Sequence, residues 1–153
     1  MTFKVVYRPE NLGYGAFKQV ETKCFPDESI DAGKFNEWVT QDFWTVYGGD
    51  RFIGYGYLML KPGFAWIARV GVTPGWRNKG VGNSLMETMI DYCQKHGRSR
   101  IILYVQQDNP SAIRLYRKFK FNESEVTYQY VIPIQRFPDS HRQSVSQSVA
   151  AVP

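Results

Sequence analysis

The sequence is poor in the residues that most often build disulfide frameworks and metal sites. Its 153 residues include two cysteines, Cys24 and Cys93, and two histidines, His96 and His141. Two cysteines at this separation neither build a disulfide framework nor have the spacing of a zinc site. The histidines fall at a predicted helix end and in a predicted tail, so no Ser/His/Asp or Cys/His relay is expected. We therefore expect no metal and no acyl-enzyme.

Long hydrophobic runs are also missing from the sequence. No apolar stretch approaches the length of a membrane span, and Phe3–Tyr7 is too short for a signal peptide. We therefore expect a cytoplasmic protein with no membrane partner. No block rich in Lys and Arg occurs either, although the formal net charge is +5. That charge favours an acidic partner such as an anionic cofactor or an acidic peptide. A nucleic-acid-binding function would rest on the net charge alone, and we expect no nucleic acid partner.

Hydrophobic periodicity predicts one α/β domain over residues 1–136. The element order β-α-α-β-β-β-α-β-α-β is typical of a single mixed, mostly antiparallel sheet flanked by helices. The predicted strands are Thr2–Tyr7, Phe43–Tyr47, Arg51–Leu60, Phe64–Val72, Arg100–Val105 and a last strand from Phe121 onward. The predicted helices are Leu12–Cys24, Ser29–Thr40, Gly80–His96 and one that Asn109 caps. Residues 137–153 have no periodicity and are expected to form a flexible tail.

The stretch from Ala68 to Asn83 is the most informative part of the chain. A strand ends near Thr73, a turn with Arg77, Lys79 and two glycines follows, and a helical pattern begins behind the turn. Backbone N–H groups at a helix N-terminus bind anions, and glycines let a phosphate approach the backbone. The stretch therefore predicts a pyrophosphate-binding turn. The alternative is a plain strand–turn–helix connection with a glycine-rich cap.

Two common nucleotide-binding motifs do not fit this turn. The Walker A pattern G-x-x-x-x-G-K-[ST] is absent, and the Rossmann pattern needs a glycine where this chain has Leu85. The pattern that does fit is R-x-x-G-x-G, formed by Arg77, Gly80 and Gly82. It resembles the acetyl-coenzyme A (acetyl-CoA) motif of the GCN5-related N-acetyltransferase (GNAT) family.

A second motif strengthens this resemblance. The family typically shows N-x-x-A-x-x-x-Y-x-x-x-G-F about thirty residues after the first motif. The residues that match it here are Asn109, Ala112, Tyr116 and Phe121. Lys120 stands at the usual glycine, which puts the turn geometry after the helix in question. The resemblance covers residues 2–136, and within the family the chain looks most like protein N-terminal acetyltransferases, including the ribosomal-protein alanine type.

The resemblance implies a cofactor site along the strand, the turn and the helix that follows. The backbone of Val70 and Val72 would pair with the pantetheine arm of acetyl-CoA. A β-bulge near Gly71 would open a gap for the thioester, and an N–H in that gap would support the oxyanion. Asn109 would contact the pantetheine arm or would serve only as a helix cap. The residues implied to hold the pyrophosphate are Arg77, Asn78, Lys79, Gly80, Val81 and Gly82.

The resemblance also implies catalytic roles for two tyrosines. Tyr116 is the candidate general acid, because a phenol can protonate the coenzyme A thiolate that leaves; the alternative is a packing role on its helix. Ribosomal-type relatives carry a glutamate base where this chain has Tyr104. Tyr104 would relay a proton through water or would simply line the cleft. Further cleft candidates, which lack positional support, are Glu28, Tyr47, Tyr57, Tyr128 and Tyr130.

These observations together predict an N-acetyltransferase. We expect acetyl-CoA as co-substrate, a primary amine as acceptor, and direct attack in a ternary complex. A peptide or protein N-terminus is the leading acceptor, and a polyamine, an amino acid or an aminoglycoside is the alternative. A non-catalytic acyl-CoA-binding module is a further alternative, because the usual glutamate is missing. Either a monomer or a homodimer is compatible with the sequence.

Overall fold

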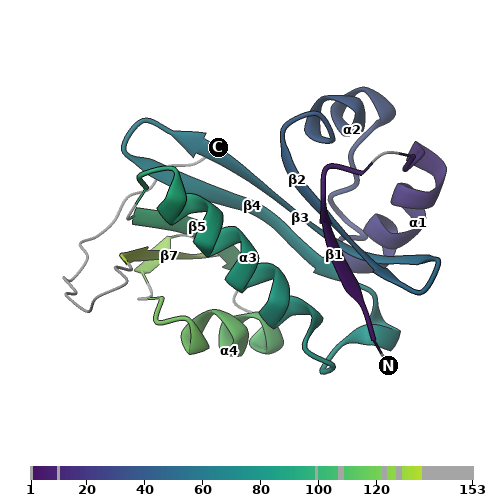
Figure 1. The fold of residues 1–153 in the computed structure, drawn as a ribbon. Coiled ribbons are helices and arrows are strands. Elements are labelled where there is room, and N and C mark those ends of the chain that lie inside the picture. The colour runs from purple at the N-terminus through teal and green to yellow at the C-terminus, as the bar shows by residue number, and fades with distance from the viewer. Residues whose placement is uncertain are drawn as a thin grey trace. The chain divides into compact units, whose positions relative to one another are not determined.

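The structure is a computed structural model in which residues 2–9, 11–98, 100–106, 109–121, 124–126 and 129–135 are described. Nearly all elements appear where the sequence predicts them (Figure 1). The strands are β1 (Lys4–Tyr7), β2 (Asp42–Gly48), β3 (Arg51–Lys61), β4 (Phe64–Val72), β5 (Arg100–Gln106), β6 (Ser124–Val126) and β7 (Gln129–Gln135). The helices are α1 (Tyr14–Cys24), α2 (Ala32–Trp38), the short 3-10 helix η1 (Pro74–Trp76), α3 (Val81–Lys95) and α4 (Pro110–Lys118).

The strands confirm the predicted mixed, mostly antiparallel sheet. Hydrogen-bonded neighbours among the described strands follow the order β1-β2-β3-β4-β5-β7-β6. The β4–β5 pair is parallel, whereas β1–β2, β2–β3, β5–β7 and β6–β7 are antiparallel. A parallel pair needs a long crossover, and α3 lies within that connection.

One predicted element is wrong. The single strand expected from Phe121 onward is two antiparallel strands, β6 and β7, in which Val126 pairs with Gln129. An alternating pattern has the same period on both sides of a reversal, so it does not reveal where the chain turns back. Tyr128 and the predicted tail, residues 137–153, lie outside the described residues.

The chain divides into two compact units. The first contains the residues up to Met59 together with Arg69–Met89. The second contains Leu60–Ala68 and the residues from Ile90 onward. In the part of the chain that the structure describes, no helix is both long enough and apolar enough to cross a membrane.

An aromatic core fills one side of the sheet in the first unit. Phe17 of α1 is fully buried, and its ring centroid lies 4.6 Å from Phe35, 4.8 Å from Tyr55 and 6.2 Å from Phe43. These contacts place α1 and α2 together against β2 and β3 (Figure 1). In the sequence, Leu12, Ala16, Val20 and Cys24 recur at four-residue spacing, which is a helical period. The structure buries Phe17, Val20 and Glu21 and exposes Ala16.

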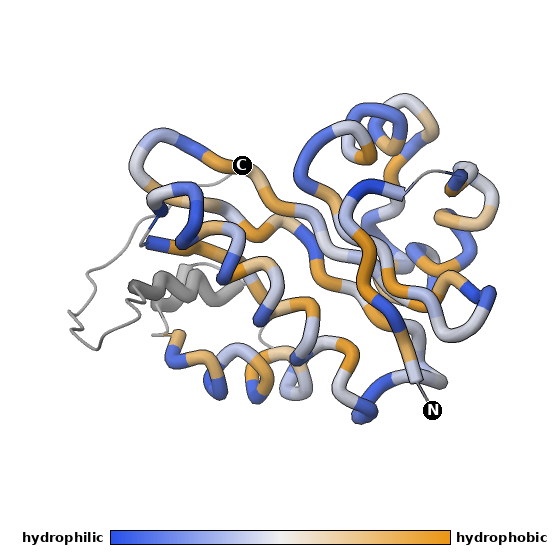
Figure 2. The backbone as a smooth tube through the Cα atoms, in the orientation of Figure 1, coloured by the Kyte–Doolittle hydropathy of each residue, from blue (hydrophilic) through white to orange (hydrophobic). Residues whose placement is uncertain are grey.

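Helix α3 packs on the opposite face of β3. Hydrophilic and hydrophobic residues alternate along this helix (Figure 2), as expected for an amphipathic helix with one buried side. Its residues Leu85 and Met89 lie against Gly56, which alternates with the core residues Tyr55 and Tyr57 along the strand. A Cβ at Gly56 would lie 2.7 Å from Met89 Sδ, so the glycine permits the close approach of the helix.

Gly54→Ala is expected to destabilise the protein far more than Gly56→Ala. A Cβ at Gly54 would lie 2.7 Å from the backbone oxygen of Gly71, which cannot move without shifting β4, whereas Met89 is a flexible side chain. Overpacking costs about 1–3 kcal/mol, so we expect a loss near the upper end for Gly54→Ala and about 1 kcal/mol or less for Gly56→Ala. Urea denaturation of the two variants measures the difference. Equal losses would contradict this account of β4.

The second unit is built on β5. Its parallel ladder with β4 joins Ala65–Ile67 to Ile101–Leu103, while its antiparallel ladder with β7 covers all residues from Arg100 to Gln106. Ile101, Ile102, Leu103 and Val105 are buried, as expected for a strand that pairs on both sides. The recorded ladder with β4 thus ends at Leu103, although β4 continues to Val72.

Candidate functional site

The turn between β4 and α3 has the backbone shape of an anion-binding loop. Asn78 has a φ of 62° and Gly80 a φ of 88°, so two left-handed residues flank Lys79 immediately before the helix. Alternation of right- and left-handed residues turns successive N–H groups toward one point and forms a concavity for an anion. The first N–H groups of α3 have no partner within the helix and carry its positive dipole end. Arg77 and Lys79 are exposed here and add positive charge.

Contacts within the first unit hold this turn in place. Thr73 N donates to Ile53 O at 2.9 Å, and Trp76 packs so closely on Gly48 that a Cβ there would clash with the indole. Arg77 Nε donates to the backbone oxygen of Val72 at 2.8 Å. The arginine therefore lies back on the end of β4, and it occupies one lone pair of a carbonyl that the sequence analysis assigned to pantetheine.

Gly71 of β4 lies close to two side chains at the end of α1. A Cβ at this residue would lie 3.0 Å from Phe25 Cε2 and 3.2 Å from Cys24 Sγ, so a larger residue would push these side chains away. Burial raises the pKa of the Cys24 thiol, while the nearby Arg77 guanidinium lowers it. Because the net shift is upward, the thiol stays protonated, which agrees with a mechanism that has no cysteine nucleophile. Val70 and Val72 on either side are half-buried.

The predicted catalytic tyrosines and Asn109 belong to the second unit. Burial raises the pKa of Tyr116 to about 12, and its ring packs edge-on against Phe121 at 5.9 Å. Burial also raises the pKa of the half-buried Tyr104 to about 12, and its ring meets Trp66 edge-on at 6.3 Å. Both phenols are thus neutral near pH 7. Asn109 Oδ1 accepts from Ala112 N at 3.2 Å, so this residue is a helix cap, as one of its two readings predicted.

The part of the chain that contains this turn matches a known protein family. The family model "Acetyltransferase (GNAT) family" matches residues 12–121, which include the turn and α4. The chain belongs to this family. The resemblance deduced from R-x-x-G-x-G and the second motif is thereby confirmed.

Individual relatives of this GNAT chain are distant. A mycothiol acetyltransferase from Corynebacterium glutamicum (strain R) is 29% identical over 101 residues, or 64% of this chain and 35% of that protein. Across four such relatives, the chain spans 19% to 35% of their length.

The PaiA N-acetyltransferase of Thermoplasma acidophilum, solved with coenzyme A, has a TM-score of 0.77 at 15% identity, covering 89% of this chain and 100% of that one. The ribosomal-protein-S18-alanine N-acetyltransferase of Escherichia coli has a TM-score of 0.71 at 18% identity, and the match covers 93% of this chain and 100% of that one. These two structures show that the fold is shared.

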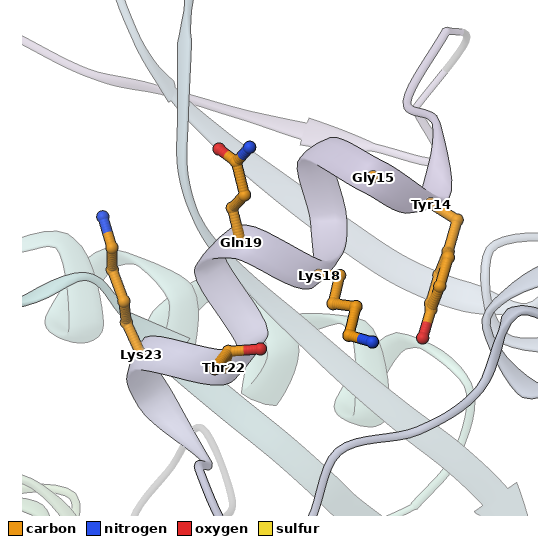
Figure 3. A pocket seen from close by; sticks show the side chains of 6 residues that line it. All are labelled: Tyr14, Gly15, Lys18, Gln19, Thr22 and Lys23. Carbon is orange, nitrogen blue, oxygen red and sulfur yellow. The ribbon is translucent and has the colours of Figure 1, made fainter.

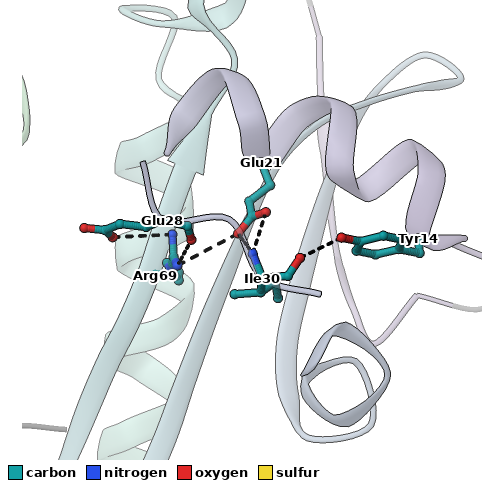
Figure 4. Close-up of polar contacts among 5 residues, drawn as sticks. All are labelled: Tyr14, Glu21, Glu28, Ile30 and Arg69. Atoms are coloured by element: carbon teal, nitrogen blue, oxygen red, sulfur yellow. Dashed lines mark hydrogen bonds and ion pairs between the residues drawn. The ribbon is translucent and has the colours of Figure 1, made fainter. Parts of the chain in front are cut away.

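The GNAT chain contains a polar cluster of which sequence reasoning named only Glu28. The Arg69 cluster comprises Glu21, Phe25, Glu28, Tyr55 and Arg69 of the first unit, and Figure 4 shows its polar contacts. The Arg69 side chain is 12% exposed, and its guanidinium lies 4.3 Å from the Phe25 ring centroid and 5.6 Å from that of Trp38. Arg69 Nη2 donates to Glu28 O at 2.8 Å. The cluster thus places a cation between aromatic rings beside Gly71.

Glu21 holds the connection between α1 and α2 in place. Its carboxylate is fully buried and accepts from Ile30 N at 3.2 and 3.3 Å, while Tyr14 Oη donates to Ile30 O at 2.7 Å (Figure 4). Arg69 Nη2 lies 3.9 Å from Glu21 Oε2. Burial raises the pKa of Glu21, and the Ile30 N–H and Arg69 oppose that rise. The connection between α1 and α2 is therefore held by α1 at Ile30 and by β4 at Glu28.

The predicted site residues fall into two groups. Val70, Val72 and the turn from Arg77 to Gly82 lie in the first unit with Glu28, whereas Tyr104, Asn109 and Tyr116 lie in the second. Among the other cleft candidates, Tyr57 Oη is bonded to Gln41 at 2.7 Å, Tyr47 packs on Phe52 at 5.9 Å, and Tyr130 lies on β7.

The sequence did contain a signal for Arg69 and for Glu21, which the sequence analysis missed. Arg69 is a cation inside an apolar strand, and Glu21 occupies the position four after Phe17 on the buried stripe of α1.

A shallow hollow on α1 is separate from these residues. Figure 3 shows it, and its lining consists of Tyr14, Gly15, Lys18, Gln19, Thr22 and Lys23. Lys18 Nζ lies 5.7 Å above the Tyr14 ring, and no residue of the R-x-x-G-x-G turn lines the hollow. It is the solvent face of an amphipathic helix and suggests no chemistry of its own.

Proposed function

We propose that this chain transfers the acetyl group of acetyl-CoA to a primary amine. The observation that carries the proposal is the turn before α3, in which Asn78 and Gly80 are left-handed and Arg77 and Lys79 are exposed. Such a loop suits the doubly charged pyrophosphate of coenzyme A. The residues that would hold it are Arg77, Asn78, Lys79, Gly80, Val81 and Gly82.

The strand β4 would bind the pantetheine arm through its backbone. Val70 and Val72 lie beyond the last residue that pairs with β5, which is Ile67. Their backbone groups on that side are suited to pair with an extended amide chain, as an added strand would. Asn109 would contact the same arm with the donor groups that capping leaves free. A β-bulge near Gly71 would open the gap for the thioester.

Chemistry would proceed by direct attack. Acetyl-CoA supplies an activated thioester, the amine nitrogen forms the new C–N bond, and the C–S bond breaks. Tyr116 would give its phenolic proton to the departing thiolate, and Tyr104 would pass a proton from the amine to water. An α-amino group has a pKa of about 8 and is partly neutral near pH 7, so it needs little help from a base.

The acceptor that we favour is a peptide or protein N-terminus. The low pKa of an α-amino group suits a chain with Tyr104 where related enzymes have a carboxylate base. A small-molecule amine is the second candidate, because several relatives are mycothiol acetyltransferases.

Release of coenzyme A in the presence of an acceptor panel tests this function. The purified chain would be incubated with acetyl-CoA and with peptides that differ in their first residue, polyamines, amino acids and aminoglycosides. We expect thiol release that depends on the amine, and a product heavier by one acetyl group. Binding of acetyl-CoA without acetylation of any amine would instead indicate a non-catalytic acyl-CoA-binding module. Failure to bind acetyl-CoA would overturn the proposal, because the proposed co-substrate would be wrong.

A further inference from the structure

The Arg69 cluster contains two buried polar atoms that have no hydrogen-bond partner among the described residues. They are Arg69 Nη1 and Tyr55 Oη. Tyr55 is fully buried, and the Arg69 side chain is 12% exposed. Both side chains contact Phe25, whose ring centroid lies 4.3 Å from the Arg69 guanidinium and 6.4 Å from the Tyr55 ring. Leaving a buried donor unpaired is costly, so two such donors in one cluster point to a ligand oxygen.

The cluster lies next to the proposed position of the thioester. Arg69 and Gly71 are two residues apart on β4, so they face the same side of the strand at a spacing of about 7 Å. Phe25, which stacks on the guanidinium, also approaches the Gly71 position to within 3.0 Å of an added Cβ. An amine that attacks at Gly71 would therefore have its neighbouring atoms directed toward Arg69.

Glu28 covers Arg69 only loosely. Its side chain is 53% exposed, and its Oε1 lies 3.9 Å from Arg69 Nη1, which is too far for a hydrogen bond. The loop does not depend on this carboxylate, because Arg69 holds the backbone oxygen of Glu28 at 2.8 Å. The Glu28 side chain can consequently turn outward while the loop stays in place. Exposed pairs of this kind contribute little to stability.

We propose that the carbonyl oxygen of an α-aminoacyl acceptor displaces the Glu28 carboxylate and accepts a hydrogen bond from Arg69 Nη1, with Tyr55 Oη as the second donor. This inference rests on the proposed function and names the acceptor class of that same site. The buried Glu21 carboxylate still faces the guanidinium after Glu28 has turned outward, so a second negatively charged group is disfavoured. A cationic amine next to a neutral carbonyl suits this arrangement of charges. Peptides and aminoacyl conjugates have that structure, whereas polyamines, aminoglycosides and free amino acids do not.

Three acceptors of similar size test the proposal. Alaninamide has the neutral carbonyl, alanine has a carboxylate, and propylamine has neither. The three amines differ in pKa, so kcat/KM is compared per neutral amine. On that basis we expect kcat/KM for alaninamide to exceed that for each of the other two by about 10-fold or more, the effect of one hydrogen bond to a charged group. Tyr55→Phe and Arg69→Lys should each reduce this preference by about 10-fold through a higher KM for alaninamide, with KM for acetyl-CoA unchanged.

The matched control is Tyr7→Phe, which removes a hydroxyl that is bonded to Asp42 at the exposed end of β1. It should leave the preference intact. A purely structural role of Tyr55 or Arg69 would lower the rates for all three amines together and would overturn the proposal. Equal use of propylamine and alaninamide by the wild-type chain would overturn it as well, while the proposed function would stand. If acetyl-CoA binds and no amine of any class is acetylated, both fail.

Discussion

Gly80→Asp is expected to weaken acetyl-CoA binding by about 100-fold or more. The φ of Gly80 is 88°, where a residue with a Cβ is strained by about 1–2 kcal/mol. The new carboxylate would also face the pyrophosphate in the loop that the N–H groups form. Together these effects exceed the roughly 2.7 kcal/mol that a 100-fold change in Kd represents. Calorimetric titration with acetyl-CoA measures the loss.

Gly75→Asp is the control for that experiment. Gly75 belongs to η1 in the same connection, its φ is outside the left-handed region, and an added Cβ would meet no atom within 4 Å. The same charge placed there should change Kd by less than about 3-fold, because charges that are exposed and well separated are screened. Gly80→Ala separates strain from charge and should fall between the two. Equal binding by Gly80→Asp and the wild-type chain would rule out this turn as the pyrophosphate site.

Tyr116→Phe is expected to lower kcat by about 100-fold with little change in KM for acetyl-CoA, since general acids typically contribute 10²–10⁴-fold. The ring itself is retained, so its packing against Phe121 at 5.9 Å should survive and the melting temperature should change little. Steady-state kinetics with the best acceptor measures the effect. Tyr92→Phe, a tyrosine of α3 that stacks on His96, makes the same chemical change in another helix and should leave kcat unchanged. A Tyr116→Phe variant with full activity would leave Tyr116 as a packing residue.

The pH profile should reflect the amine and neither tyrosine. Burial raises the pKa of Tyr116 to about 12, so its proton is lost only as the pH rises through that value. An acid with this pKa causes no fall in kcat between pH 6 and about pH 10. The rate should therefore rise as an α-amino acceptor loses its proton near pH 8, and should then stay level. A fall that begins near pH 8 or 9 and disappears in Tyr116→Phe would show a much lower pKa for this phenol.

Local sequence patterns were sufficient to predict most of the fold. Turn and cap chemistry act over a few residues, so the cap at Asn109 could be predicted. Packing decided what these patterns leave open. On α1, the aromatic cluster around Phe17 selected which stripe is buried, and no spacing rule distinguishes that stripe from the one that includes Ala16. The reversal between Val126 and Gln129 was missed because alternation is the same on both strands.

The sequence by itself determined the family and the anion-binding turn. Those conclusions follow from Arg77, Gly80 and Gly82, whose chemistry depends on backbone conformation within a few residues. Only the tertiary structure placed Arg69 of β4 beside Glu21 and Phe25 at the end of α1 and beside Tyr55 of β3. The side chain of a strand residue contacts segments that lie far away in the sequence, and the sequence does not show which segments these are. The proposed amine selectivity of this chain is a property of that assembly, because buried charges and unpaired donors exist only once the segments have packed.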